Sequence, residues 1–369
     1  MKIVARAAAL LALATGCAPV RGDAYLAAFA GAERAFHAGR FVEAASAWDD
    51  AAGRALRVKD RDEARFLEAR AYDRAGLWAE ARRTYERLAA DSPGGPRTVR
   101  ARFDVAELDI QHGDAAQGFQ ALEDTARASP AHGLSRPAIR RLLQHAQDEG
   151  GDAAALTWLD TRGKAFRGTD LDDVIAYERG RTLERLGRKQ EAHDAFLATA
   201  HEHPYPSGGL TDDAYWHASI IDEELGRYDE AIAHLRELLS FREPSGAWAS
   251  YERPRYSEAQ LKIAHIYRDD LKDRASARRE LEKLYALHPT TIKRDDAVWD
   301  EARLALEDGD RDTTCKLARR LLDEFPESRY ARCAHDLCPS AAPGKRACAD
   351  YILRELHGVP GDDEPRPPP

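Results

Sequence analysis

Four cysteines near the C-terminus are the residues of this 369-residue chain that are best placed to do chemistry: Cys315, Cys333, Cys338 and Cys348. An even set of thiols usually forms disulfides when a protein is exported. Three pairings are possible, and proximity in the sequence favours Cys315 with Cys333 and Cys338 with Cys348. The alternative is a tetrahedral zinc site in which His335 joins the last three cysteines, although no C-x-x-C pair is present.

The fifth cysteine, Cys17, follows a short apolar run at the N-terminus. Lys2 and Arg6 precede this run, which is too short to span a bilayer because a spanning helix needs about 20 residues. Residues 1–16 are therefore predicted to be a signal peptide. The run ends in Ala-Thr-Gly-Cys, which resembles the lipobox of bacterial lipoprotein precursors. This resemblance implies cleavage before Cys17, lipid on its sulfur, and a lipidated linker over residues 17–23; the alternative is an ordinary secretory peptide.

Motifs of known catalytic chemistry are absent from the sequence. It contains no G-x-x-x-x-G-K-S/T, no G-x-G-x-x-G after a strand, no G-x-S-x-G and no H-E-x-x-H. His201, Glu202 and His203 come nearest to a metal cluster, but side chains two residues apart do not share a helix face. The chain is therefore predicted not to be an enzyme and to require no cofactor or metal ion.

Composition favours helices in an open-ended array. About 350 residues follow the signal peptide, more than one compact core usually holds. Ala, Leu, Arg and Glu dominate and β-branched residues are sparse, which suits helices. The formal net charge is -9, with both signs interspersed, whereas a nucleic-acid-binding protein needs a basic stripe. No nucleic-acid partner is expected.

Six glycines interrupt helical patterns at near multiples of one interval: Gly39, Gly76, Gly113, Gly187, Gly226 and Gly309. Seven residues before them stand small residues, which are Ala32, Ala69, Ala106, Gly180, Ser219 and Ala302. Five residues after them stand Ala44, Ala81, Gly118, Ala192, Ala231 and Thr314. Mostly large apolar residues follow four positions later: Trp48, Tyr85, Leu122, Phe196, Leu235 and Ala318.

This spacing predicts a helix, a tight turn and a second helix in each unit. Glycine ends the first helix in the left-handed conformation, and small residues let the two helices cross at close range. Prolines after each second helix stop it before the next unit begins. These are Pro93, Pro130, Pro204, Pro289 and Pro326.

The pattern resembles the tetratricopeptide repeat family over roughly residues 24–330, most closely at 64–88 and 214–238, where the turns read Gly-Leu-Trp-Ala-Glu-Ala and Gly-Arg-Tyr-Asp-Glu-Ala. The resemblance implies an all-α fold, a right-handed α-solenoid of about eight helix pairs with a C-terminal capping helical segment. Two units depart from the pattern. Residues 135–166 carry Gly150-Gly151 with few other marks, and residues 255–289 have Leu271 at the glycine position with one residue inserted.

The expected organisation after the linker has five parts: an array of units one to six at 24–243, a proline-containing connection at 244–254, units seven and eight at 255–330, a cysteine-containing cap at 331–357, and a disordered tail at 358–369. The tail is too polar and proline-rich to pack. The cap is expected to cover apolar surface that the last unit would otherwise expose.

An aromatic residue precedes each of the six glycines by ten positions: Phe29, Phe66, Phe103, Tyr177, Trp216 and Trp299. The family resemblance implies that this position, and the one four residues later, line a concave groove. The second set is Glu33, Arg70, Glu107, Arg181, Ile220 and Arg303. Aromatic anchors beside charges suit a bound peptide. The alternative is that the aromatic stripe is core between units.

The chain also resembles, in repeats and anchor, the repeat-containing lipoprotein of the outer-membrane β-barrel assembly machine. This implies a lipid-anchored scaffold that binds envelope proteins or peptides and contacts the membrane through lipid on Cys17. Ala18 follows that cysteine where an aspartate would favour the inner membrane, so we expect the outer membrane, with the protein facing the periplasm. The alternative function is binding of peptidoglycan or a small ligand, with the aromatic stripe stacked on sugar rings.

Overall fold

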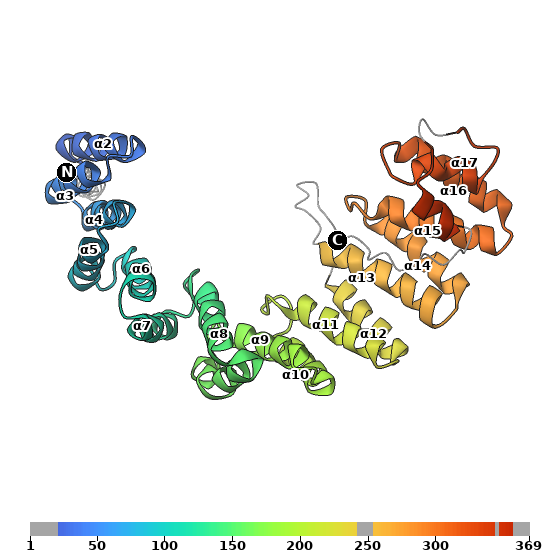
Figure 1. Ribbon diagram of the computed structural model, residues 1–369, viewed down its shortest axis with the longest axis horizontal. Coiled ribbons are helices and arrows are strands. Elements are labelled where there is room, and N and C mark those ends of the chain that lie inside the picture. The colour runs from blue at the N-terminus through green and yellow to red at the C-terminus, as the bar shows by residue number, and fades with distance from the viewer. Residues whose placement is uncertain (1–20, 242–253, 344–346, 357–369) are drawn as a thin grey trace, which may run out of the picture. The chain divides into compact units, whose positions relative to one another are not determined.

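The computed structural model describes residues 21–241, 254–343 and 347–356. Within these ranges the regular elements are helices, and no strand occurs (Figure 1). The predicted signal peptide with Cys17, the tail at 358–369 and all but one residue of the connection at 244–254 lie outside the described residues. The chain divides into two compact units at Ile175, and each is described by itself.

Unit 1 contains four successive helix pairs. The first three are α2 (Asp23–His37) with α3 (Phe41–Arg54), α4 (Val58–Arg74) with α5 (Trp78–Asp91), and α6 (Thr98–His112) with α7 (Ala115–Ala128). The fourth is α8 (Ser135–Thr161), which breaks at Gly150 and Gly151 because both have non-helical backbone angles. The turn η1 (Gly163–Phe166) follows it. From α2 to α8, each helix packs against the next one along the chain (Figure 1).

Four more pairs follow, beginning with α9 (Asp172–Arg185), in which the boundary between the units falls. The elements are α9 with α10 (Lys189–Glu202), α11 (Thr211–Glu224) with α12 (Tyr228–Ser240), α13 (Pro254–His265) and η2 (Ile266–Asp270) with α14 (Arg274–Leu287), and α15 (Arg294–Glu307) with α16 (Arg311–Glu324). The cap consists of η3 (Ala331–Cys333), α17 (Ala334–Leu337) and α18 (Asp350–Leu356). The all-α fold of eight helix pairs predicted from the sequence is confirmed over the described residues.

Small residues lie buried where the two helices of a pair cross. Ala69 and Ala81 are both fully buried, as are the corresponding alanines of the other clear helix pairs. Gly118 shows how close the crossing is, because a β-carbon there would lie 2.7 Å from the backbone nitrogen of Ile110. Backbone meets backbone at this point, so a larger residue would separate the helices.

Glycine ends the first helix in five of the six clear helix pairs, with φ between 71° and 77°. At Gly226 the turn is closed by Arg227, whose N–H donates to the carbonyl of Asp222 at 2.8 Å. Gly113 is the exception. Its φ is −132°, so the predicted left-handed conformation is wrong at this turn. The turn there is one residue shorter, and the side chain of Asp114 caps the next helix instead.

The seventh pair makes its turn without glycine. Lys272, one residue after the expected position at Leu271, adopts φ 55°. The inserted residue is accommodated by the π-helical turn η2, after which the N–H of Asp273 donates to the carbonyl of Tyr267 at 2.8 Å. Single π-helical turns of this kind absorb one extra residue in a helix.

Two disulfides fasten the cap, and they correct the expected pairing. Cys315 on α16 is bonded to Cys338, and Cys333 is bonded to Cys348, with Cα atoms 5.0 and 4.7 Å apart. The pairing from sequence proximity is wrong because α17 lies against α16 and brings its C-terminal end to Cys315. The zinc alternative fails because all four thiols are used, while His335 Nδ1 contacts the carbonyl of Ala341 at 2.9 Å.

Removing the Cys333–Cys348 bond should destabilise the cap. The bond closes a loop with a sequence separation of 15 residues, for which chain entropy predicts about 3 kcal/mol. We expect a Cys333→Ser/Cys348→Ser double variant, in a Cys17→Ser background, to melt at a lower temperature and to become sensitive to proteolysis near residue 350. Thiol titration should find four reactive thiols in the background protein only after reduction; free thiols before reduction would contradict the assignment.

Candidate functional site

A pocket of about 430 Å³ opens in unit 1, where α4 and α6 meet the linkers that precede α6 and α8. Its lining is Phe66, Arg70, Pro96, Arg97, Arg100 and His132. Phe66 and Arg70 come from α4, one helical turn apart, and Arg100 comes from the first turn of α6. Three guanidinium groups and an imidazole therefore surround an aromatic ring and a proline.

Two of the three arginines already have carboxylate partners. Arg97 lies 4.9 Å above the ring of Phe66 and donates through Nη2 to Glu63 at 2.7 Å. Arg100 Nε donates to Asp104 at 2.9 Å. Arg70 is exposed and, among the described residues, makes no hydrogen bond or ion pair. The pocket thus holds one guanidinium that makes no hydrogen bond or ion pair in the described part of the chain and can take an incoming anion.

A second pocket of about 140 Å³ adjoins the first and shares Arg70 and Arg100 with it. Its lining is Arg70, Asp73, Tyr85, Arg100, Asp104, Glu107, Leu108 and Gln111. Burial raises the pKa of Asp104 above its usual value, although Arg100 and Arg70 act in the opposite direction. We call the residues that line the two pockets the α4–α6 groove. It is cationic at one end and carries both signs at the other.

The predicted aromatic stripe is mostly core. Phe66, Phe103, Tyr177 and Trp299 are 1–8% exposed, whereas Phe29 and Trp216 are half-buried. The buried rings contact neighbouring residues of the same unit of the chain: Phe103 stacks on His132 with ring centroids 5.7 Å apart, for example. These rings fill junctions between successive helices, and the edge of Phe66 also lines the pocket.

The residues four positions later lie nearer the surface. Glu33 and Arg70 are exposed, and Glu107, Arg181, Ile220 and Arg303 are partly buried. Of the twelve predicted groove residues, Phe66, Arg70 and Glu107 line the α4–α6 groove. Arg97, Arg100 and His132 were missed because they lie outside the two registers. Arg97 and Arg100 are three residues apart and therefore fall on one side of the turn that begins α6. That spacing was the sign in the sequence that the two side chains could act together.

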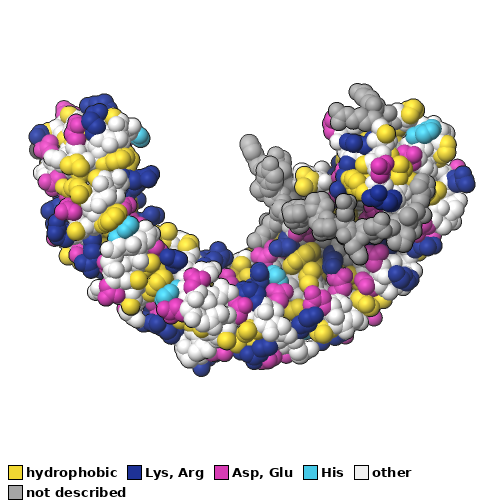
Figure 2. All heavy atoms as spheres, in the orientation of Figure 1, with side chains coloured by type: hydrophobic (Ala, Val, Ile, Leu, Met, Phe, Trp, Pro, Cys, Tyr) yellow, Lys and Arg dark blue, Asp and Glu magenta, His cyan; other side chains and the backbone are white. Residues whose placement is uncertain are grey.

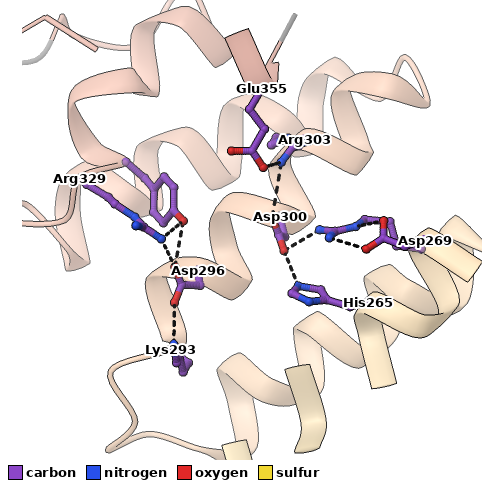
Figure 3. Close-up of polar contacts among 10 residues, drawn as sticks. His265, Asp269, Lys293, Asp296, Asp300, Arg303, Arg329 and Glu355 are labelled. Atoms are coloured by element: carbon purple, nitrogen blue, oxygen red, sulfur yellow. Dashed lines mark hydrogen bonds and ion pairs between the residues drawn. The ribbon is translucent and has the colours of Figure 1, made fainter. Parts of the chain in front are cut away.

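At the last repeat the predicted groove positions are covered by the chain's own cap. Trp299 is 1% exposed and stacks on Tyr330 with ring centroids 4.8 Å apart. Arg303 donates to Glu355 of α18 at 2.5 Å (Figure 3). Ile352 of the same helix is fully buried in the core cluster that contains Trp299. In this structure neither predicted residue is available to a partner.

A polar network beside Arg303 joins α15 to its neighbours (Figure 3). Asp300 accepts from Arg268 Nη1 at 2.8 Å and lies 3.0 Å from His265 Nε2. Burial alone would raise the pKa of Asp300, but His265 and the nearby guanidinium groups hold it below its usual value. Because each charge has a partner, we read this network as structural.

Charged side chains of both signs alternate over the face drawn in Figure 2. Among the helices that the structure describes, none is long and apolar enough to cross a bilayer.

Models of the tetratricopeptide repeat match three segments of the chain: 63–95, 212–244 and 258–291. The chain carries tetratricopeptide repeats. The matched segments begin on α4, α11 and α13 and extend over the paired helices α5, α12 and α14. Stacked tetratricopeptide repeats create extended surfaces that bind other proteins, so this chain is a scaffold for protein interactions.

Solved structures with tetratricopeptide repeats are also similar to the chain. The C-terminal part of a repeat-containing protein from Cytophaga hutchinsonii is 14% identical, with a TM-score of 0.43 over 73% of this chain and 98% of that one. A repeat protein from Parabacteroides merdae is 13% identical, with a TM-score of 0.33 over 81% and 98%. The pilF protein of Pseudomonas aeruginosa is 17% identical, with a TM-score of 0.37 over 62% and 93%. No curated protein sequence matches the chain.

Trp299→Ala should destabilise the chain strongly, because it empties a fully buried site between α15 and the cap. Truncation of a buried tryptophan costs about 3–5 kcal/mol. Trp78→Ala, at a side chain that is 44% exposed, is the control and should cost much less. The measurement is urea unfolding followed by helical circular dichroism. Equal losses in the two variants would mean that Trp299 is not core.

Proposed function

We propose that the chain is a lipid-anchored scaffold of the bacterial envelope that holds a protein partner by an acidic segment in the α4–α6 groove. The observation that carries the proposal is Arg70, an exposed cation without an ion-pair partner among the described residues, beside Phe66. A carboxylate of the partner would make charge-assisted hydrogen bonds with this guanidinium. Such bonds are roughly twice as strong as neutral ones.

The rest of the groove suggests the order of residues in the partner. An apolar side chain next to the acidic one would lie against Phe66 and Pro96. At the other end, Asp73 and Glu107 would attract a basic residue. Opposite charges at the two ends fix the direction in which a peptide lies and disfavour the reverse direction.

Two features support the envelope as the compartment. The apolar run that ends at Cys17 is typical of an exported lipoprotein, and several acyl chains on one cysteine give stable anchoring. The two cap disulfides suit an oxidising compartment. With Ala18 after the lipid site, we propose the outer membrane, the periplasmic side, and a role in outer-membrane assembly or envelope maintenance.

Peptide binding tests the groove. The probe is a set of labelled peptides that combine Glu, Leu and Lys in all orders, measured by fluorescence anisotropy. The peptide with an acidic and a basic end should bind best, and Arg70→Glu should weaken its binding at least tenfold because attraction becomes repulsion. The matched control is Arg83→Glu on α5, a 70% exposed side chain paired with Glu80.

Equal binding by the Arg70→Glu and Arg83→Glu variants would remove the groove from the proposal. Saturable binding of soluble peptidoglycan fragments that displaces the peptide would favour the alternative function, a carrier of a glycan or small ligand.

Lipid attachment is tested separately from binding. Cells that express the full-length chain are fed an alkyne fatty acid, and the label on the protein is measured with its distribution between membrane and soluble fractions. We expect label and membrane association in the parent and loss of both in Cys17→Ser. A Cys17→Ser protein that stays labelled would show that the lipid site is elsewhere, and an unlabelled parent would rule out the anchor.

A further inference from the structure

Three consecutive helices of unit 2 bring two imidazoles and a carboxylate together. His193 on α10, Asp222 on α11 and His234 on α12 each offer one ligand atom, and these atoms all lie within 4.8 Å of one another. His193 Nε2 is 3.0 Å from Asp222 Oδ1, and His234 Nδ1 is 2.8 Å from Oδ2. The side chain of Asp222 is 1% exposed, that of His193 10% and that of His234 20%.

Asp194 offers a hydrogen-bond acceptor to the second ring nitrogen of His193. His193 Nδ1 lies 3.3 Å from a carboxylate oxygen of Asp194, so in one of the two neutral tautomers Nδ1 carries the proton and donates it there. Nε2 then presents its lone pair. Metal-binding histidines commonly donate their other ring N–H to a carboxylate in this way.

In this tautomer two buried acceptors face each other. His193 Nε2 and Asp222 Oδ1 are buried, and neither has a hydrogen-bond partner of acceptable geometry among the described residues, although they are 3.0 Å apart. A lone pair and a carboxylate oxygen repel at that distance unless a positive charge lies between them. Ligands of a common metal ion converge on one point in this way, and His234 Nδ1 completes the set although it also shares a proton with Asp222 Oδ2.

Arg227 is the competing cation. Its Nη2 lies 2.8 Å from Asp222 Oδ1, but that contact also lacks hydrogen-bond geometry, and Nη1 donates to Gln190 at 3.0 Å. The side chain is 31% exposed, and withdrawal of Nη2 from Asp222 while Nη1 keeps Gln190 is the movement that metal binding requires.

We propose that His193 Nε2, Asp222 and His234 Nδ1 bind one divalent transition-metal ion of the zinc class, with water at the remaining position. Imidazole and carboxylate are zinc ligands, at about 2.0–2.2 Å from the metal. Ca²⁺ and Mg²⁺ prefer oxygen ligands alone. Binding displaces the proton that His234 Nδ1 shares with Asp222, so affinity falls as the solution is acidified.

A bound ion would tie α10, α11 and α12 to one another, and thus two successive repeats of unit 2. The site is independent of the α4–α6 groove because it shares no residue with it. Its expected consequence is a metal-dependent gain in the melting temperature, since the ion binds the folded chain.

The test is Zn²⁺ titration of the full-length chain, purified without a polyhistidine tag and stripped with chelator. Competition with a chromophoric chelator gives the affinity, and Co²⁺ replaces Zn²⁺ to report coordination through its visible spectrum. We expect one ion per chain, at least a tenfold loss of affinity in His193→Gln and in His234→Gln, and a gain in Arg227→Gln. His201→Gln, an exposed histidine on the same α10, is the control and should bind as the parent does.

Circular dichroism and the melting temperature, both measured in chelator, distinguish a variant that has lost a metal ligand from one that no longer folds. If the buried His193→Gln variant unfolds, the more exposed His234→Gln variant decides. Parent-like affinity in a folded His234→Gln protein would overturn the proposal, as would a parent that binds no Zn²⁺ or whose binding is lost in His201→Gln instead.

Discussion

The close crossing of two helices in each pair is the constraint on which the other features depend. Fully buried alanines at Ala69 and Ala81, and a glycine at Gly118 where a β-carbon would strike the backbone, bring the helix axes together. Once the crossing is fixed, the rotation of each helix about its axis is fixed too. That rotation decides which residues enter the core, such as Phe66, and which reach the surface one turn later, such as Arg70.

This constraint is also why so much of the fold could be predicted from the sequence. Turn glycines, small residues at the crossing and prolines after the second helix each reflect a local steric requirement. The same requirement recurs in every helix pair, so it leaves a periodic pattern in the sequence. The failures occur where another local solution serves the same end. Asp114 caps a shorter turn after Gly113, and Lys272 replaces glycine after a π-helical turn. The cysteine pairing failed because it depends on how α17 packs, which sequence distance does not record.

The candidate site was predictable in part for the same reason. Phe66, Arg70 and Glu107 occupy registers set by the helix pair, so their periodicity was visible. Arg97 and His132 lie in linkers, where no period applies, and the pairing of Arg97 with Glu63 is tertiary. The availability of Arg70 could not be predicted either, because it depends on which carboxylates are occupied by other arginines. Likewise, the burial of Trp299 reflects a cap that the repeat pattern does not contain.

The cap has a consequence for the contact of one molecule with another. An uncovered final pair would expose Trp299 and its apolar neighbours, and a contiguous exposed apolar patch promotes association with other molecules. Because α18 occupies that surface and Cys348 bonds its segment to Cys333, each molecule carries a covalently secured end to the array. The end of the array is therefore covered within the single chain.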